Sequence, residues 1–170
     1  MLNNKATKKV LQDYAKYVIQ QSKSNLTKGR KNVDRSLYNS LKYDITETED
    51  ALLLEFEMND YGEFQDKGIK GSKSTYSESR NSPYKYISKR PPLEPIIEWA
   101  KKRKIRFRDE KGRYKEGNYK SIGFVLQRSI FQKGIKGSQF FTKPFEKGQE
   151  RLDPELIKAL EIDIEKFFNI

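Results

Sequence analysis

Two short segments of this chain alternate apolar and polar residues, and they limit what the rest of the sequence can build around them. The segments are residues 41–46 and 52–58, separated by the polar stretch 47–50. A period of two places one face of a strand against a core and the other face in water. We therefore expect an antiparallel hairpin. Its inward residues are Leu41, Tyr43 and Ile45 in the first strand and Leu52, Leu54, Phe56 and Met58 in the second.

The hairpin is preceded by a stretch whose apolar residues recur at helical spacing. We expect a helix from about Thr7 to Lys28, ended by Gly29. A short helical turn should follow over residues 35–40, capped by Asp34 or Asn32. The apolar face of the long helix consists of Val10, Leu11, Tyr14, Tyr17, Val18 and Leu26.

A second long helix is predicted at the end of the chain. Asp153 is placed as its N-cap, Pro154 as its first residue, and Leu152 as a hydrophobic staple onto Ile157. Its apolar stripe runs to the last residues, and such a stripe is expected to face the core. The stripe consists of Leu156, Ile157, Leu160, Ile164, Phe167 and Phe168.

The middle of the chain is less regular. Residues 60–66 resemble one helical turn closed by Gly68, and residues 68–92 form a long segment rich in Gly, Ser, Lys, Tyr and Pro. We expect this segment to be an irregular loop that takes its order from neighbouring molecules. A helix opened by Pro92 or Pro95 follows, and its inward residues are Leu93, Ile96, Ile97 and Ala100. After a turn at 109–113, another helix is predicted over about 118–132. Its inward residues are Ile122, Val125, Leu126 and Ile130.

Together these elements predict a single α+β domain over residues 1–170. A small antiparallel sheet is packed by the N- and C-terminal helices, and a basic loop-and-helix region is inserted at 66–120. The longest apolar run, residues 51–54, is far too short to cross a membrane. With no secretory leader visible behind the first residues, we expect the protein to assemble in a cytoplasm.

One short motif occurs twice. The sequence Lys-Gly-Ile-Lys-Gly-Ser is found at 67–72 and again at 133–138, each time after a Phe-Gln pair. The simpler interpretation is a glycine that ends a helix, used twice. The other is a pair of basic loops lining one surface. The motif is too short to predict a repeat architecture.

Composition removes several kinds of chemistry. The chain has no cysteine and no histidine, so thiolate zinc sites, cysteine nucleophiles and histidine-based triads are excluded. Glu63, Asp66 and Lys67 resemble the acid-and-lysine sets of metal-dependent nucleases, but they lack a spaced acidic partner, and a solvated helix end explains them better. No phosphate-binding glycine motif is present. We expect no enzyme activity, no cofactor and no metal.

Most of the excess positive charge lies in one part of the sequence. The net charge is +11, and residues 66–120 alone carry seventeen Lys/Arg against seven Asp/Glu. Clustered basic residues neutralise phosphates without reading sequence. A solvated face or an acidic protein partner remains the alternative. The predicted helices at 93–104 and 118–132 are too far apart for a helix-turn-helix. The candidate nucleic-acid-binding residues are Lys101, Lys102, Arg103, Lys104, Arg106, Arg108, Arg113 and Lys115.

The order of motifs resembles a family of virion proteins. The motifs are RSLYNSL at residues 35–41, YGEFQDKG at 61–68, PPLEPIIEWA at 91–100 and FFTKPF at 140–145. In this order they resemble the neck or tail-completion (minor tail component) proteins of tailed bacteriophages. The resemblance implies a ring-forming structural subunit at the head–tail connection, around the DNA channel, with portal, adaptor or tail proteins as partners. It implies no catalytic residues.

The subunit contacts of such a ring can be placed on large aromatic residues, which are enriched at interface hot spots. Trp99 lies off the apolar face of its helix, where it serves either the core edge or a subunit contact. The candidate interface residues are Trp99, Tyr61, Phe64, Phe140, Phe141 and Phe145. The main alternative to a virion subunit is a basic accessory protein that binds nucleic acid without sequence preference.

Overall fold

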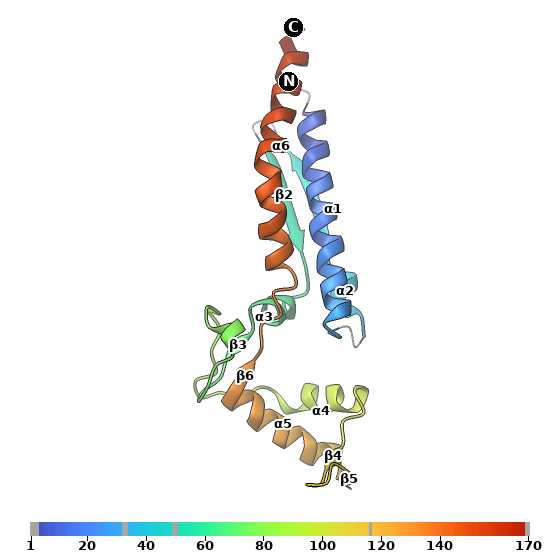
Figure 1. The fold of residues 1–170 in the computed structure, drawn as a ribbon, viewed down its shortest axis with the longest axis vertical. Coiled ribbons are helices and arrows are strands. Elements are labelled where there is room, and N and C mark those ends of the chain that lie inside the picture. Colours follow the sequence, from blue (N-terminus) through green and yellow to red (C-terminus); the bar gives the residue numbers. More distant parts are fainter. Residues whose placement is uncertain (1–3, 32–33, 49–50, 116, 169–170) are drawn as a thin grey trace. The chain divides into compact units, whose positions relative to one another are not determined.

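The protein is represented by a computed structural model that describes residues 4–31, 34–48, 51–115 and 117–168 (Figure 1). It is an α+β fold in which small antiparallel sheets are flanked by N- and C-terminal helices, as predicted. The chain forms two compact units. Unit 1 is Met1–Gly62 with Gln139–Ile170, and unit 2 is Glu63–Ser138. The basic region predicted at 66–120 lies inside unit 2.

Unit 1 is built on two long helices that lie side by side (Figure 1). They are α1 (Lys5–Lys28) and α6 (Thr142–Phe168), and α1 also contacts the hairpin of β1 (Lys42–Glu47) and β2 (Leu52–Glu57). The predicted period-two alternation is confirmed. Strand residues at alternate positions are half-buried while their neighbours are exposed, and Ile45 pairs with Leu54 across the hairpin. The two residues 49–50 of the predicted turn lie outside the described part of the chain.

The helix ends of this unit follow local signals. Gly29 ends α1, as predicted. The turn α2 (Ser36–Ser40) begins one residue later than expected, and the Asp34 carboxylate accepts a hydrogen bond from the Ser36 N–H at 3.1 Å. The N-cap position of α2 is nevertheless Arg35, which makes no side-chain cap bond, so the predicted cap at Asp34 is wrong by one residue. Asn32 lies outside the described residues.

The buried core cluster of unit 1 joins α1 and α2 to the residues that lead into β1 and α6. Leu26, Leu37, Leu41 and Phe140 form a buried cluster. Beside it, the ring of Phe56 contacts three other rings, with centroid separations of 5.4–6.2 Å. These neighbours are Tyr14, Phe141 and Phe145. Edge-to-face contacts of this kind join α1, the sheet and α6 into one core.

The predicted start of the last helix is wrong. α6 begins at Thr142 and passes through Pro154, so Asp153 is not its N-cap and the staple with Leu152 is not formed. An interior proline removes one backbone hydrogen bond. The first part of α6 nevertheless packs closely on α1, because Gly148 lies against the Tyr14 ring, and a Cβ added there would be 2.7 Å from that ring. This packing stabilises the helical segment before Pro154, which the local sequence signals placed outside the helix.

The predicted packed face of α6 is also wrong. The helix buries Ala159 and Asp163 and leaves the apolar stripe largely in solvent. The carboxylate of Asp163 accepts hydrogen bonds from the backbone N–H groups of Ala6 and Thr7, at 3.0 and 2.8 Å. Those N–H groups lie in the first turn of α1, which has no intrahelical acceptor for them. Asp163 therefore caps a helix that is more than 150 residues distant in sequence.

Unit 2 contains a pair of helices and several very short strands. α4 (Leu93–Lys102) packs on α5 (Tyr119–Lys133), where Gly123 allows Ile97 to approach. Asn118 caps α5 through a 2.7 Å bond from the Ser121 N–H. Of the predicted inward face of α5, Ile122 is buried but Val125 is 56% exposed, which corrects that assignment. The remaining elements are α3 (Tyr61–Lys67, whose first residues belong to unit 1), β3 (Ile69–Lys70), a 3-10 turn at Ser77–Ser79, β4 (Phe107–Arg108), β5 (Tyr114–Lys115) and β6 (Gly134–Ile135).

The two copies of the repeated motif bind each other. β3 and β6 are the Ile-containing parts of the two copies, and Ile69 pairs with Ile135 in an antiparallel bridge. The Ser72 N–H donates to Phe131 O at 2.9 Å, and the Ser138 N–H donates to Gln65 O at 3.0 Å. Each copy also ends a helix with a glycine of positive φ, as the simpler interpretation predicts. The motif is therefore a near-symmetric clasp where the chain enters and leaves unit 2.

The segment 68–92 is less irregular than predicted. Ser79 is buried, and its hydroxyl donates to Ile135 O at 2.7 Å and accepts from the Gly137 N–H at 2.9 Å. The Ser82 hydroxyl donates to Gly68 O at 2.7 Å. The segment thus bonds to both copies of the clasp within its own chain. The segment was expected to take its order entirely from neighbouring molecules, but these serines hold it by bonds within the chain.

Candidate functional site

Charge is divided unequally between the two units. Unit 2 carries twenty Lys/Arg and eight Asp/Glu, whereas unit 1 carries fifteen Lys/Arg and sixteen Asp/Glu. The net charges are therefore +12 and −1. Positive charge concentrated on one unit creates a stronger local field for polyanions than the same surplus spread over the whole surface.

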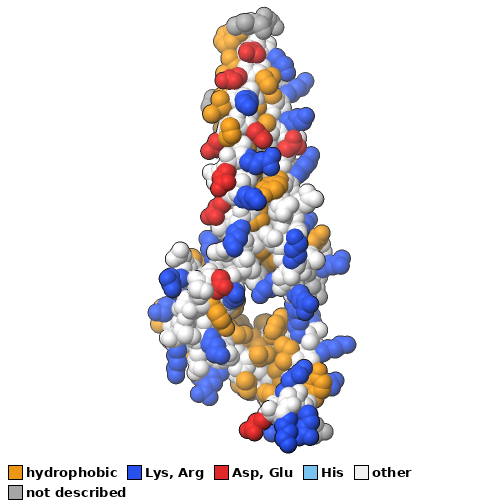
Figure 2. Space-filling model, viewed as in Figure 1, with side chains coloured by type: hydrophobic (Ala, Val, Ile, Leu, Met, Phe, Trp, Pro, Cys, Tyr) orange, Lys and Arg blue, Asp and Glu red, His pale blue; other side chains and the backbone are white. Residues whose placement is uncertain are grey.

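The densest part of that charge lies at the end of α4 and on the β4–β5 hairpin that follows. Register pairs Arg108 with Tyr114 across the hairpin. Its turn is fixed by Asp109, whose carboxylate accepts from the backbone N–H groups of Lys111 and Arg113 at 3.0 and 2.8 Å. This is the turn predicted at 109–113. Figure 2 shows Lys and Arg side chains gathered where Figure 1 labels β4 and β5.

All eight predicted nucleic-acid-binding residues are exposed, and the chain path brings them together at this end of unit 2. Lys111, which the sequence prediction left out, is also exposed in the turn. Arg113 is partly engaged, because its Nε donates to Asp109 Oδ2 at 3.0 Å. We call the group formed by residues 101–115 the basic hairpin region.

An aromatic ring organises two arginines of this region. The guanidinium groups of Arg106 and Arg108 lie 5.6 and 4.9 Å from the centroid of the Tyr114 ring. Such cation–π contacts hold the guanidinium planes in place at a modest cost in entropy. The Tyr114 side chain remains 66% exposed. The arrangement can contact phosphates through arginine while the tyrosine ring is accessible to a base.

The structure separates the predicted interface residues into two groups. Trp99, Tyr61 and Phe64 are 42%, 46% and 38% exposed, and Phe64 also stacks edge-on against Tyr84 at 4.5 Å. Phe140 is 1% exposed inside the core of unit 1, so its assignment to a subunit interface is wrong. Phe141 and Phe145 are half-buried in the aromatic cluster around Phe56, so their rings contribute mainly to packing within the protomer.

An exposed surface on α6 was predicted from the sequence to be buried. Apart from the half-buried Leu156, the apolar stripe predicted to face the core is exposed, between 39% for Ile164 and 62% for Phe168. The positions preceding it on the same face are acidic. We call this the α6 stripe: Glu146, Glu150, Asp153, Ile157, Leu160, Ile164 and Phe167, spaced alternately by four and three residues and all exposed. Helical spacing identified the stripe correctly, but periodicity alone does not reveal what it faces.

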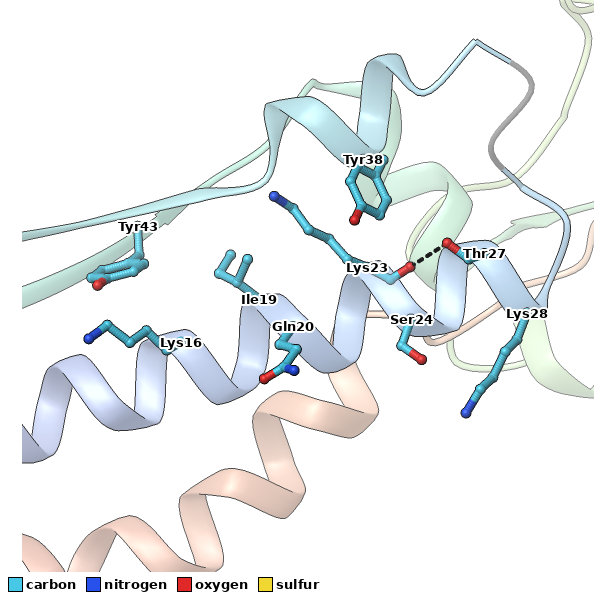
Figure 3. A pocket seen from close by; sticks show the side chains of 9 residues that line it. All are labelled: Lys16, Ile19, Gln20, Lys23, Ser24, Thr27, Lys28, Tyr38 and Tyr43. Carbon is cyan, nitrogen blue, oxygen red and sulfur yellow. Dashed lines mark hydrogen bonds between the residues drawn. The ribbon is translucent and has the colours of Figure 1, made fainter.

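Unit 1 also has an open groove between α1, α2 and β1 (Figure 3). Its cavity volume is about 730 Å3. The lysines Lys16, Lys23 and Lys28 line it, and no lining residue is acidic. Tyr38 and Tyr43 supply aromatic walls, and the Lys23 ammonium lies 5.0 Å from the centroid of the Tyr38 ring. The remaining lining residues are Ile19, Gln20, Ser24 and Thr27.

The nuclease-like residues form an ordinary surface pair. Lys67 Nζ lies 2.6 Å from Glu63 Oε1, one helical turn apart. This bond, with a second from the Tyr84 hydroxyl, lowers the pKa of Glu63. Asp66 is buried. Within the described ranges, no cluster of three or more carboxylates is placed to hold a metal ion.

Comparisons with known proteins add no identification. No protein-family model, no curated protein and no solved structure matches this chain. Across the part of the chain that the structure describes, none of the helices has both the length and the apolar character needed to span a bilayer.

Proposed function

We propose that this chain is a structural subunit of a tailed-bacteriophage virion. It would form a homo-oligomeric ring at the head–tail connection, in the neck or at the completed end of the tail, around the DNA channel. Its partners would be the portal, adaptor or tail proteins on either side. The order of sequence motifs supports the family, and the surfaces of the two units support the role.

The observation that carries the proposal is the exposed α6 stripe. Contiguous apolar side chains on a long helix are seldom left in water by a monomer, and they mark sites of association. Ile157 and Leu160, two apolar members of this stripe, are 61% and 44% exposed. The helix instead orients Asp163 inward. The protomer thus keeps an apolar face available, which suits a subunit whose burial is completed by neighbours.

The basic unit supports the location. A ring around DNA needs positive charge without sequence recognition, because the DNA must slide past it. Contacts to phosphate position a protein but specify no sequence. The basic hairpin region supplies exposed Lys and Arg on a two-stranded hairpin, and among the described residues of unit 2 neither α4 nor α5 is arranged as a recognition helix beside a short turn.

The test is to look for the chain in assembled particles. Mass spectrometry of purified virions should find it in several copies per particle, and deletion of its gene should leave heads and tails unjoined or tails incomplete. Absence of the chain from particles that are otherwise infectious would contradict the proposal.

A second candidate is a basic accessory protein that binds nucleic acid without sequence preference. The observation that favours it is the Tyr114 ring held beside Arg106 and Arg108, an arrangement suited to stacking with unpaired bases. Single-stranded DNA should then bind more tightly than duplex DNA, and the chain should be absent from particles. The structural-subunit proposal expects no such preference.

A further inference from the structure

We propose that the groove of unit 1 receives the α6 stripe of a second copy of the same chain. This inference rests on the proposed ring and names the contact that would build it. The stripe of one protomer would lie along α1, between α2 and β1 of the next. Both surfaces belong to unit 1, so the contact is independent of how unit 2 is placed.

The α6 stripe combines acidic and apolar residues on one face of the helix. Its first three members, Glu146, Glu150 and Asp153, are acidic, and its next three, Ile157, Leu160 and Ile164, are apolar. They share one face because spacings of four and three residues return to the same side of a helix. All of them are exposed in the protomer. The stripe therefore offers one acidic half and one apolar half to a partner.

The groove carries charge of the opposite sign to the stripe. Its charged lining residues are the three lysines, and its walls carry the rings of Tyr38 and Tyr43 and the side chain of Ile19. Figure 3 shows Lys16, Ile19 and Lys23 extending from α1 on the side of the two tyrosines. A groove with basic and apolar walls and no carboxylate matches an acidic and apolar helix face. Complementary charge of this kind selects the partner and fixes its register.

The stripe and the groove lie on different elements of unit 1. The groove uses α1 with α2 and β1, whereas the stripe is on α6, so each copy carries one donor surface and one acceptor surface. A contact between two different surfaces is heterologous, and repetition of a heterologous contact closes a ring when the rotation between copies permits it. A contact between two α6 stripes would instead produce a two-fold dimer, and the like charges of the two acidic halves oppose that arrangement when the helices are parallel.

The natural absence of cysteine gives a direct test, because engineered cysteines are the only thiols in the chain. One variant carries Lys16→Cys in the groove and another carries Leu160→Cys on the stripe. A short bismaleimide crosslinker added to an equimolar mixture should give a product of two-chain mass. Neither variant alone should give that product, because each has a thiol on only one side of the contact.

Matched controls separate docking from random collision. Lys9→Cys places an exposed thiol on α1 outside the groove, and Lys158→Cys places one on α6 off the stripe. Mixtures that contain either control should crosslink only at the collisional level. In the Lys16→Cys chain, Lys23→Glu with Lys28→Glu should lower the yield by roughly fivefold, and Glu146→Lys with Glu150→Lys in the partner should restore it.

Several outcomes would overturn the inference. Efficient crosslinking of Leu160→Cys to itself would assign the stripe to a two-fold contact. Yields from the control thiols equal to those from the test pair would show that no specific contact exists. The same pair is then examined in purified particles that incorporate both variants. A chain that is present in particles but not crosslinked there would overturn this contact and leave the proposed function standing, whereas absence from particles would count against the proposed function.

Discussion

The carboxylate of Asp163 accepts hydrogen bonds from both the backbone N–H and the hydroxyl of Thr7, each at 2.8 Å. Both residues are buried, and the bond joins the end of α6 to the start of α1. α1 has no side-chain cap of its own at Asn4. The Asp163 carboxylate therefore replaces a local cap by one from a distant helix, and it fixes which face of α6 is turned inward.

Replacing this carboxylate tests its contribution to stability. Asp163→Asn should lower the free energy of unfolding by about 2 kcal/mol, because charge-assisted hydrogen bonds to a helix N-terminus are removed in a buried place. Urea unfolding at pH 7 measures the change. Glu161→Gln, on the exposed side of the same helix, is the control and should be nearly neutral. Equal effects of the two substitutions would contradict a cap role for Asp163.

The same residue predicts a pH dependence. Burial alone would raise the pKa of Asp163, but the hydrogen bonds from Thr7 and Ala6 outweigh it and lower the pKa. The stabilisation is therefore fully present above the unfolded-state pKa of about 3.9, and it is lost as pH falls through the lower folded-state value. The stability difference between the wild-type chain and Asp163→Asn should shrink below about pH 4 in acid titrations. A difference that stays constant would contradict the assignment.

Because the two repeated motifs pair closely in the clasp, the free energy of unfolding should be very sensitive to substitution of one glycine. Gly134 has φ +82°, and a Cβ there would overlap the Ile69 carbonyl oxygen of the other copy. Gly134→Ala should cost about 3 kcal/mol, from left-handed strain and overpacking together. Gly112→Ala has a similar φ of +76° but open space around it, so it should cost only about 1 kcal/mol. Hydrogen exchange of the Ile69 and Ile135 amides measures opening of the clasp. Equal protection of these amides in the two variants would contradict the close contact at Gly134.

Ser79 predicts how the segment 68–92 is held. Ser79→Ala leaves the Gly137 N–H and the Ile135 carbonyl without their partner, which should cost about 2 kcal/mol in a buried place. Limited proteolysis should then cut faster after Lys73, Arg80, Lys85 and Lys89 than in the wild-type chain. Ser74→Ala, at an exposed position, is the control. If the wild-type segment is cut as fast as the variant, these bonds do not hold it.

Pro154 distinguishes one continuous helix from a helix that starts at this residue. In a continuous α6, Pro154→Ala restores a backbone hydrogen bond and should raise the free energy of unfolding by about 1–3 kcal/mol. In a helix that starts there, the proline is favourable and the substitution would give no gain. Thermal unfolding compares the variant with Glu155→Ala, an exposed neighbour that should change stability little.

The basic hairpin region predicts weak, salt-dependent binding of DNA. The affinity should correspond to a Kd of about 10⁻⁴–10⁻⁶ M at physiological salt and should fall steeply as salt rises. Replacing Lys101, Lys102, Arg103 and Lys104 by Gln should reduce the slope of log K against log salt by about 0.9 for each phosphate that is no longer neutralised. The fold should remain intact because these side chains are exposed.

A matched variant with four exposed lysines of unit 1 replaced by Gln serves as the control for net charge. Suitable positions are Lys5, Lys9, Lys42 and Lys158. It should change the salt slope much less than the unit 2 variant. If neither variant alters binding, or if the wild-type chain has no affinity for DNA at low salt, the basic hairpin region instead meets an acidic protein.

The sequence alone determined the features that depend on neighbouring residues. Alternation identified the hairpin and its inward face, Gly29 identified the end of α1, and Asn118 marked the start of α5. The location of the positive charge was visible as well. Each of these signals acts through interactions within a few residues, so a short window of sequence contains its physical cause.

Only the tertiary structure decided which of two possible faces each helix buries and which distant segments pair. α6 carries an apolar stripe, yet it turns Asp163 inward, because the unsatisfied N–H groups of α1 supply partners for a carboxylate that no local pattern reveals. The start of α6 at Thr142 depends on packing of Gly148 on Tyr14, which overrides the proline signal. The repeated motif likewise pairs with its own copy 66 positions along the chain. Pairing over such separations depends on the three-dimensional path of the chain, and periodicity within one element does not contain that path.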